Sequence, residues 1–145
     1  MKTYRICQMA NISSKQSLHI DAKVRFMELN KNQLREESIE FAIAVSDVCE
    51  DIKGCSVYIN QLLRCSSSIG ANIHEAKYAQ SRADFINKLE IALKETSETD
   101  YWLELIYRKG KITEEIFSYL KNSCGVIRRK LIASVTTAKR NSQQN

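Results

Sequence analysis

Two adjacent residues, His74 and Glu75, come closest to a metal-binding motif in this sequence. They begin the H-E-x-x-H pattern with which a helix binds zinc, but Tyr78 occupies the position of the second histidine. The sequence also lacks the Glu-x-x-His repeats that hold metal ions inside helical bundles. The only other histidine is His19, and neither histidine adjoins a serine or cysteine that it could activate. We therefore expect no metal site, no cofactor and no enzyme activity. A small hydrolase or transferase stays open only if tertiary contacts build a catalytic pair.

A second pattern, Gly110-Lys111, is similar to the end of a phosphate-binding loop. Leu105 and Ile112 stand where that loop requires its first glycine and its serine or threonine, and no strand-like segment precedes it. Nucleotide binding by this route is therefore excluded.

The five cysteines are odd in number and scattered, without any C-x-x-C pair, which argues against a zinc site and against a redox dithiol. We expect them to be reduced and to fill the core as small apolar side chains. Polar residues also interrupt the N-terminal segment where a signal peptide would need its apolar stretch. These features predict a reducing, cytoplasmic location. The five are Cys7, Cys49, Cys55, Cys65 and Cys124.

Positive charge is concentrated at the C-terminal end of the chain. Residues 31–120 carry eleven basic and fifteen acidic side chains, whereas residues 121–145 carry six basic and none acidic. Such segregation is typical of a surface that binds a polyanion such as RNA or DNA, or an acidic protein. It is equally typical of an ordinary solvated helix C-terminus, which the helix dipole favours. The candidate nucleic-acid-binding residues are Lys121, Arg128, Arg129, Lys130, Lys139 and Arg140.

The composition requires long helices to position these side chains. The 145 residues include no proline and only four glycines, too few turn-forming residues for an all-β domain. No stretch without a charged residue exceeds ten residues, whereas a membrane-spanning helix needs about twenty apolar ones. We expect a single all-α domain and no membrane association.

Apolar residues with helical spacing predict four helices. Residues 34–52 form the first stripe, with Ser38 in one core position, and Gly54 provides a left-handed stop. The second helix, residues 56–80, has an unusually small centre around Gly70, which favours close approach of another helix. The third begins at the capping serine Ser81 and ends at Gly110, and the fourth follows the N-cap Thr113.

Short connections between these helices favour an antiparallel, up-down-up-down four-helix bundle. We place the bundle at residues 31–140, with a mobile N-terminal tail at 1–30 and a disordered C-terminus at 141–145.

The third helix has more apolar residues than one core-facing stripe needs. Ile91, Trp102 and Leu105 lie off its main stripe, and aromatic anchors of this kind are enriched at subunit interfaces. These three residues are therefore our candidate oligomer interface. The alternative is a wider intramolecular face, which bundle helices often have.

The segments QLLRCSSSIGANIHEA (61–76), SRADFINKLEIALKE (81–95) and ETDYWL (98–103) support a family relationship. Together with their surroundings, residues 31–138, they resemble the bacterial four-helix-bundle family that includes proteins encoded in 23S rRNA intervening sequences. Two positions depart from the family pattern: Cys65 stands where a small residue such as serine is common, and His74 where a small or apolar residue is usual.

The resemblance implies an antiparallel bundle that assembles as a homopentameric ring and has no enzyme activity. It also implies a distant relationship to the accessory protein of diversity-generating retroelements, which binds a reverse transcriptase and nucleic acid. A reverse transcriptase or another nucleoprotein is thus a possible partner.

Polar residues of the same segments repeat at helical spacing, and we expect them to form cross-helix or cross-subunit salt bridges and amide hydrogen bonds. They are Arg64, Asn72, Glu75, Asp84, Asn87, Lys88, Glu95 and Glu98.

Two functional hypotheses follow. The first is a non-enzymatic homo-oligomer that binds nucleic acid or a nucleoprotein through its basic final helix. The second is a protein-protein scaffold or accessory subunit that does not bind nucleic acid directly.

Overall fold

The computed structural model describes residues 14–142, and the side chains of residues 32–141. These residues form four α-helices and no strand: α1 (Ser14–Asp51), α2 (Ser56–Ala76), α3 (Arg82–Arg108) and α4 (Glu114–Ser142). The chain divides into two compact units, Met1–Gln33 and Leu34–Asn145. Within the described part, no helix is long and apolar enough to cross a membrane.

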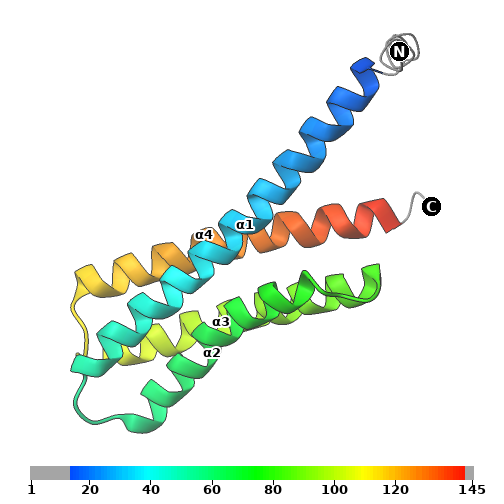
Figure 1. Ribbon diagram of the computed structural model, residues 1–145. Helices are drawn as coiled ribbons and strands as arrows, with labels where there is room; N and C mark the ends of the chain where they lie inside the picture. The colour runs from blue at the N-terminus through cyan, green and yellow to red at the C-terminus, as the bar shows by residue number, and fades with distance from the viewer. Residues whose placement is uncertain (1–13, 143–145) are drawn as a thin grey trace, which may run out of the picture. The chain divides into compact units, whose positions relative to one another are not determined.

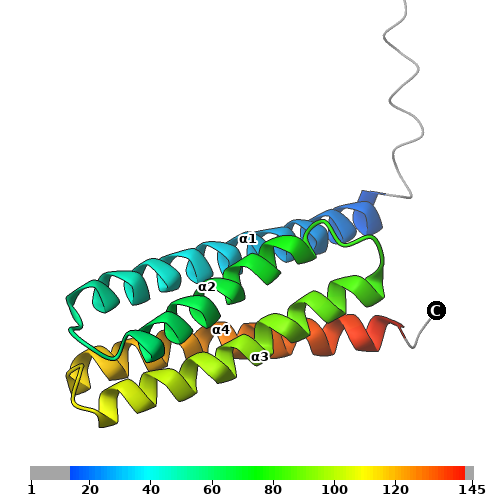
Figure 2. The same ribbon diagram turned by 90° about the horizontal axis from the view of Figure 1, so that it is seen from below.

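The second unit is an antiparallel four-helix bundle (Figures 1 and 2). From residue 34 onward, α1 runs beside α2 and α4, and α3 packs against both α2 and α4. Successive helices reverse direction at short connections. Gly54 between α1 and α2 and Gly110 between α3 and α4 adopt the left-handed conformation with φ of 77° and 67°. The predicted all-α, up-down-up-down bundle is confirmed.

The bundle core consists of the apolar stripes that the sequence predicts. Each helix buries side chains mostly at spacings of three or four residues, the period of one helix face. Four core positions are taken by hydroxyl residues, and each hydroxyl donates to a carbonyl of its own helix. The four are Ser38, Ser66, Thr96 and Thr99. The apolar core comprises Leu34, Phe41, Val45, Cys49, Leu62, Cys65, Ile69, Ile73, Ala76, Leu89, Ala92, Leu103, Ile106, Leu120, Cys124, Ile127, Leu131 and Val135.

The helix starts agree with the predicted caps. The Ser81 hydroxyl accepts a hydrogen bond from the Asp84 backbone N–H at 3.1 Å, and the Thr113 hydroxyl accepts one from Ile116 at 3.3 Å. Cys55 precedes α2 with φ of 60°, an uncommon conformation for a residue that is not glycine.

Two helix boundaries differ from the sequence prediction. Helix α1 begins at Ser14, inside the segment predicted as a tail, although the boundary between the two units after Gln33 lies close to the predicted start of the bundle. Helix α2 ends at Ala76 instead of continuing to residue 80. Beyond it, the N–H groups of Lys77, Tyr78 and Ala79 donate to carbonyls three residues back, which forms tight turns in place of the helix. The mobility predicted for residues 1–30 and the disorder predicted for 141–145 stay predictions, and residues 1–13 and 143–145 lie outside the described residues.

At Gly70, α1 and α2 approach each other closely. A Cβ atom built on Gly70 would lie 3.1 Å from the Ser38 Oγ and 3.6 Å from its Cβ. Ser38 is buried and its hydroxyl donates to the Arg35 carbonyl at 2.6 Å, so moving its side chain away would cost this hydrogen bond. The small-residue centre of α2 therefore faces a neighbouring helix, as the sequence predicts.

Replacing Gly70 by leucine should lower the free energy of unfolding by about 1–3 kcal/mol, because the added side chain has to push α1 away from α2. Chemical denaturation monitored by circular dichroism measures this change. Ser97→Leu on the exposed face of α3 is the matched control, and it should change stability by less than about 0.5 kcal/mol. Equal stability of the two variants would contradict the close contact.

Candidate functional site

All six candidate nucleic-acid-binding residues lie on α4, but the packing of α4 against α3 and α1 changes their roles. Arg128 crosses to α3, where its Nε donates to the Thr96 hydroxyl at 3.3 Å and its Nη2 donates to the Thr96 carbonyl at 3.2 Å. The same Nη2 donates to the Asp100 carboxylate at 3.2 Å. Arg128 therefore connects two helices of the bundle and offers little of its charge to a ligand.

Three of the lysines also have acidic partners on neighbouring helices. Lys130 Nζ lies 2.5 Å from Glu37 of α1, and Lys139 Nζ lies 2.6 Å from Glu90 of α3. Lys121 Nζ lies 4.0 Å from Asp100 and 3.9 Å from Glu104, and it also sits 5.1 Å from the centroid of the Phe117 ring. Four of the six candidate residues are thus ion-paired within the chain.

Arg129 and Arg140 are different. Both side chains are exposed, and among the described residues neither has an acidic partner within ion-pair distance. These two arginines are the cations of α4 that remain available to bind another molecule.

Of the candidate interface residues on α3, Trp102 has the best-defined contacts. Its ring stacks on Tyr58 of α2 with 6.0 Å between centroids and contacts Tyr101 edge-on at 5.0 Å. The indole N–H donates to Glu98 at 3.4 Å. Trp102, Ile91 and Leu105 are all partly buried, and Trp102 also packs against the core. Contacts within its own chain therefore cover much of the Trp102 side chain, which favours the wider intramolecular face over a subunit interface at this residue.

The predicted cross-helix salt bridges of the family segments are present between α2 and α3. Arg64 pairs with Glu98 and, at 3.4 Å, with Glu95, while Lys88 Nζ lies 2.5 Å from Glu75. The hydrogen bond from Arg64 lowers the pKa of the Glu98 carboxyl. The pair therefore contributes stability above the ordinary glutamate pKa, and this contribution is lost as the pH falls through the lowered value.

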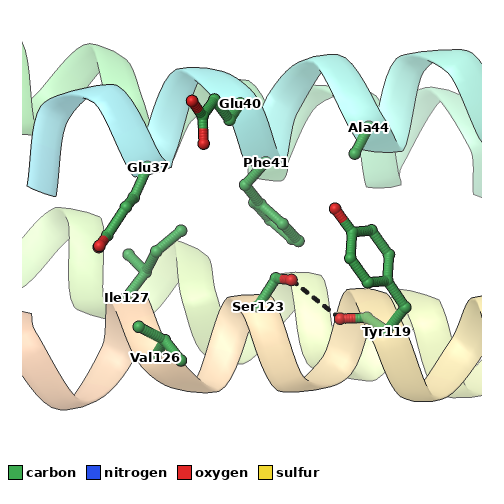
Figure 3. Close-up of a pocket in the computed structure, with 8 residues that line it drawn as sticks. All are labelled: Glu37, Glu40, Phe41, Ala44, Tyr119, Ser123, Val126 and Ile127. Carbon is green, nitrogen blue, oxygen red and sulfur yellow. Dashed lines mark hydrogen bonds between the residues drawn. The ribbon is translucent and has the colours of Figure 1, made fainter. Parts of the chain in front are cut away.

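Two grooves flank α1. One lies between α1 and α4 and holds about 190 Å³. Figure 3 shows Phe41 pointing from α1 toward α4, and Ile127 and Tyr119 pointing from α4 toward α1. The other lies between α1 and α2 and holds about 310 Å³. Within residues 32–141, no group of three or more histidine, cysteine or acidic side chains is placed to hold a metal ion.

The cysteines of the bundle are free thiols in different environments. Burial raises the pKa of Cys49 to about 11 and that of Cys124 to about 12, and it also raises the pKa of Cys65. Below pH 9.0 these thiols are neutral in the folded and in the unfolded chain, so they do not lower the stability of the fold. As the pH rises from 9.0 toward the raised pKa values, the thiols of the unfolded chain ionise first and the free energy of unfolding falls. Cys7 lies outside the described residues.

Iodoacetamide at pH 8 should alkylate Cys55 at least about tenfold faster than the buried cysteines of the bundle, because Cys55 is partly exposed and the others are shielded and protonated. Peptide mass spectrometry over a time course gives the four rates. Unfolding in urea should make the rates equal, and equal rates in the folded protein would contradict the buried positions.

Comparison with known proteins agrees with this geometry. Residues 30–133 match the model of the family described as 23S rRNA-intervening sequence protein. A solved structure from Bacteroides thetaiotaomicron, described as a protein with unknown function from the S23 ribosomal protein family, is 44% identical in sequence with a TM-score of 0.70. The alignment covers 74% of this chain and 98% of that one. The comparison with curated proteins finds no match. The family match, the shared bundle and the level of identity establish that this chain belongs to the 23S rRNA-intervening sequence protein family.

Proposed function

We propose that this protein is a non-enzymatic, cytoplasmic scaffold that assembles with copies of itself and acts through protein-protein contacts. The observation that carries this proposal is the pairing of the basic helix. Four of its six cations are neutralised by acidic residues of the same chain. The free thiols support a reducing compartment.

Exposed apolar side chains support the same proposal. Eight large apolar side chains are exposed in the described residues, and five of them lie on α1 and α4. Exposed apolar surface concentrated on two neighbouring helices is typical of a protein-binding face. The five are Ile39, Ile43, Tyr119, Val126 and Ile132.

Native mass spectrometry of the full chain at micromolar concentration tests self-assembly. We expect a cyclic homo-oligomer, and the family resemblance favours five subunits. A monomer at this concentration would contradict the proposal.

The role of Trp102 is tested separately by Trp102→Ala. Because the ring contacts Tyr58 and Tyr101 of its own chain, we expect a loss of stability of about 2 kcal/mol or more with the number of subunits unchanged. Unfolding curves and native mass spectrometry of the same sample report the two effects. Dissociation without loss of stability would instead assign Trp102 to the subunit interface.

Direct nucleic-acid binding is the second candidate function, and Arg129 and Arg140 favour it because both are exposed and lack an acidic partner in the described chain. In a ring these arginines would be repeated, so that weak contacts with phosphates add up. Fluorescence anisotropy with structured RNA, single-stranded RNA and duplex DNA tests this candidate. The scaffold proposal expects no binding at about 0.15 M salt. Salt-dependent binding that Arg129→Glu/Arg140→Glu abolishes would favour the second candidate.

A further inference from the structure

The outer face of α1 is acidic and apolar. From Glu36 to Asp51 the helix carries six acidic residues and no basic one. Ile39 and Ile43 are exposed by 36% and 55% on this face. Six exposed residues fall within about one third of the helix circumference: Glu36, Ile39, Glu40, Ile43, Asp47 and Glu50.

The groove between α1 and α2 continues this face. Ile39 and Ile43 form one wall, and the opposite wall from α2 is made of small residues, which leave about 310 Å³ of open space. The two helices approach closely here because Gly70 has no side chain to contact Ser38. An apolar groove with one acidic edge fits a helix that carries apolar and basic residues on one face.

Helix α4 has such a face on its solvent side. From residue 116 onward it contains no acidic residue. Val126 and Ile132 are exposed by 37% and 47%, and they share one face with the unpaired Arg129 and Arg140. We call this face the α4 stripe; it consists of Val126, Arg129, Ile132, Ala133, Thr136 and Arg140.

The spacing of charges on the two faces matches. Arg129 and Arg140 are eleven residues apart, as are Glu36 and Asp47, and each interval spans about 16 Å of helix. Apolar side chains lie between the charges on both faces. Glu36 also pairs with Arg35 at 2.5 Å, whereas Glu40 and Asp47 have no ionic partner among the described residues.

We propose that the α1–α2 groove binds the α4 stripe of a second copy of this chain. Arg129 and Arg140 then meet the acidic edge of α1, and Val126 and Ile132 cover Ile39 and Ile43. A nucleic acid does not fit this groove, because the acidic edge repels phosphate. This inference rests on the proposed self-assembly and names the surfaces that form it.

The geometry of the assembly follows from the surfaces. The groove and the stripe are different parts of the molecule, so every copy uses one of each and the contact is heterologous. Repeated head to tail, such contacts generate a closed ring or an open filament.

Charge reversal on the full chain tests the contact. Arg129→Glu/Arg140→Glu places carboxylates against the acidic edge, and the subunit dissociation constant should rise at least tenfold, measured by sedimentation velocity over a concentration series. Lys77→Glu/Lys94→Glu changes two exposed lysines outside the contact by the same net charge and should leave assembly unchanged. Circular dichroism confirms that each variant folds.

A rescue variant identifies the partner surface. Adding Glu36→Lys/Asp47→Lys to the stripe variant restores opposite charges at the matching spacing, and assembly should return to within about threefold of the unmodified chain. Glu36→Lys/Asp47→Lys alone should dissociate. Assembly that the stripe variant leaves intact would overturn the inference while self-assembly stands. Dissociation without rescue would overturn the pairing of these two surfaces. An unmodified chain that is monomeric would refute both this inference and the proposed function.

Discussion

Phe41→Ala is expected to lower the free energy of unfolding by about 3–5 kcal/mol. The Phe41 ring is only 3% exposed and forms part of the wall between α1 and α4 (Figure 3). Removing it loses apolar burial and enlarges a groove that already holds about 190 Å³. Urea denaturation at constant protein concentration measures the loss.

Ile43→Ala provides the control on the same helix, because Ile43 is 55% exposed and should cost less than about 1 kcal/mol when measured below the concentration at which subunits associate. Similar losses for the two variants would mean that residues 34–51 are not packed as the core arrangement requires. Phe41→Leu, which retains most of the apolar volume, should fall between them.

Arg128→Glu is expected to destabilise the bundle by about 2–4 kcal/mol, whereas the same change at the adjacent Arg129 should cost less than about 0.5 kcal/mol. Reversal of Arg128 removes the hydrogen bonds to Thr96 and brings a carboxylate close to Asp100. Arg129 is exposed and has no acidic partner in the described residues. Thermal and urea unfolding of the two variants in parallel, below the concentration at which subunits associate, provide the comparison.

This pair of variants also separates a structural role from a binding role. If Arg128 were a free phosphate ligand, its reversal would weaken nucleic-acid binding and leave stability unchanged. A loss of binding in an Arg128 variant is therefore informative only beside its unfolding curve. Equal stability of the two charge reversals would contradict the role assigned to Arg128.

Much of the fold follows from local sequence. Caps and left-handed residues predict where helices start and stop, because they act on the nearest turn. Ser81 and Thr113 cap the starts of α3 and α4, and Gly54 and Gly110 follow helix ends. The predicted end of α2 at residue 80 is wrong, since no cap or glycine marks the tight turns over residues 77–79 that follow Ala76.

The candidate surfaces were less predictable. The sequence shows six cations in the last 25 residues but does not say which of them meet an acid. Lys130 and Glu37 are 93 residues apart in the chain, and Arg128 and Asp100 are 28 apart. One signal was available: α1 and α3 are rich in acids, and an antiparallel bundle places both beside α4. The unpaired Arg129 and Arg140 could be distinguished only after the helices were packed.

The helices, their core-facing stripes, their caps and the close contact at Gly70 are thus predictable from the amino-acid order, because each depends on period, on side-chain size or on neighbours within one turn. The distribution of charge on the surface depends instead on how the helices pack. A charged side chain of α4 forms an ion pair within the chain if an adjacent helix places an acidic residue within about 4 Å of it, and otherwise it can bind another molecule. Which of the two occurs depends on the rotation and register of the helices. For this family member, packing leaves Arg129 and Arg140 without an acidic partner among the described residues, on a face of α4 that also exposes Val126 and Ile132.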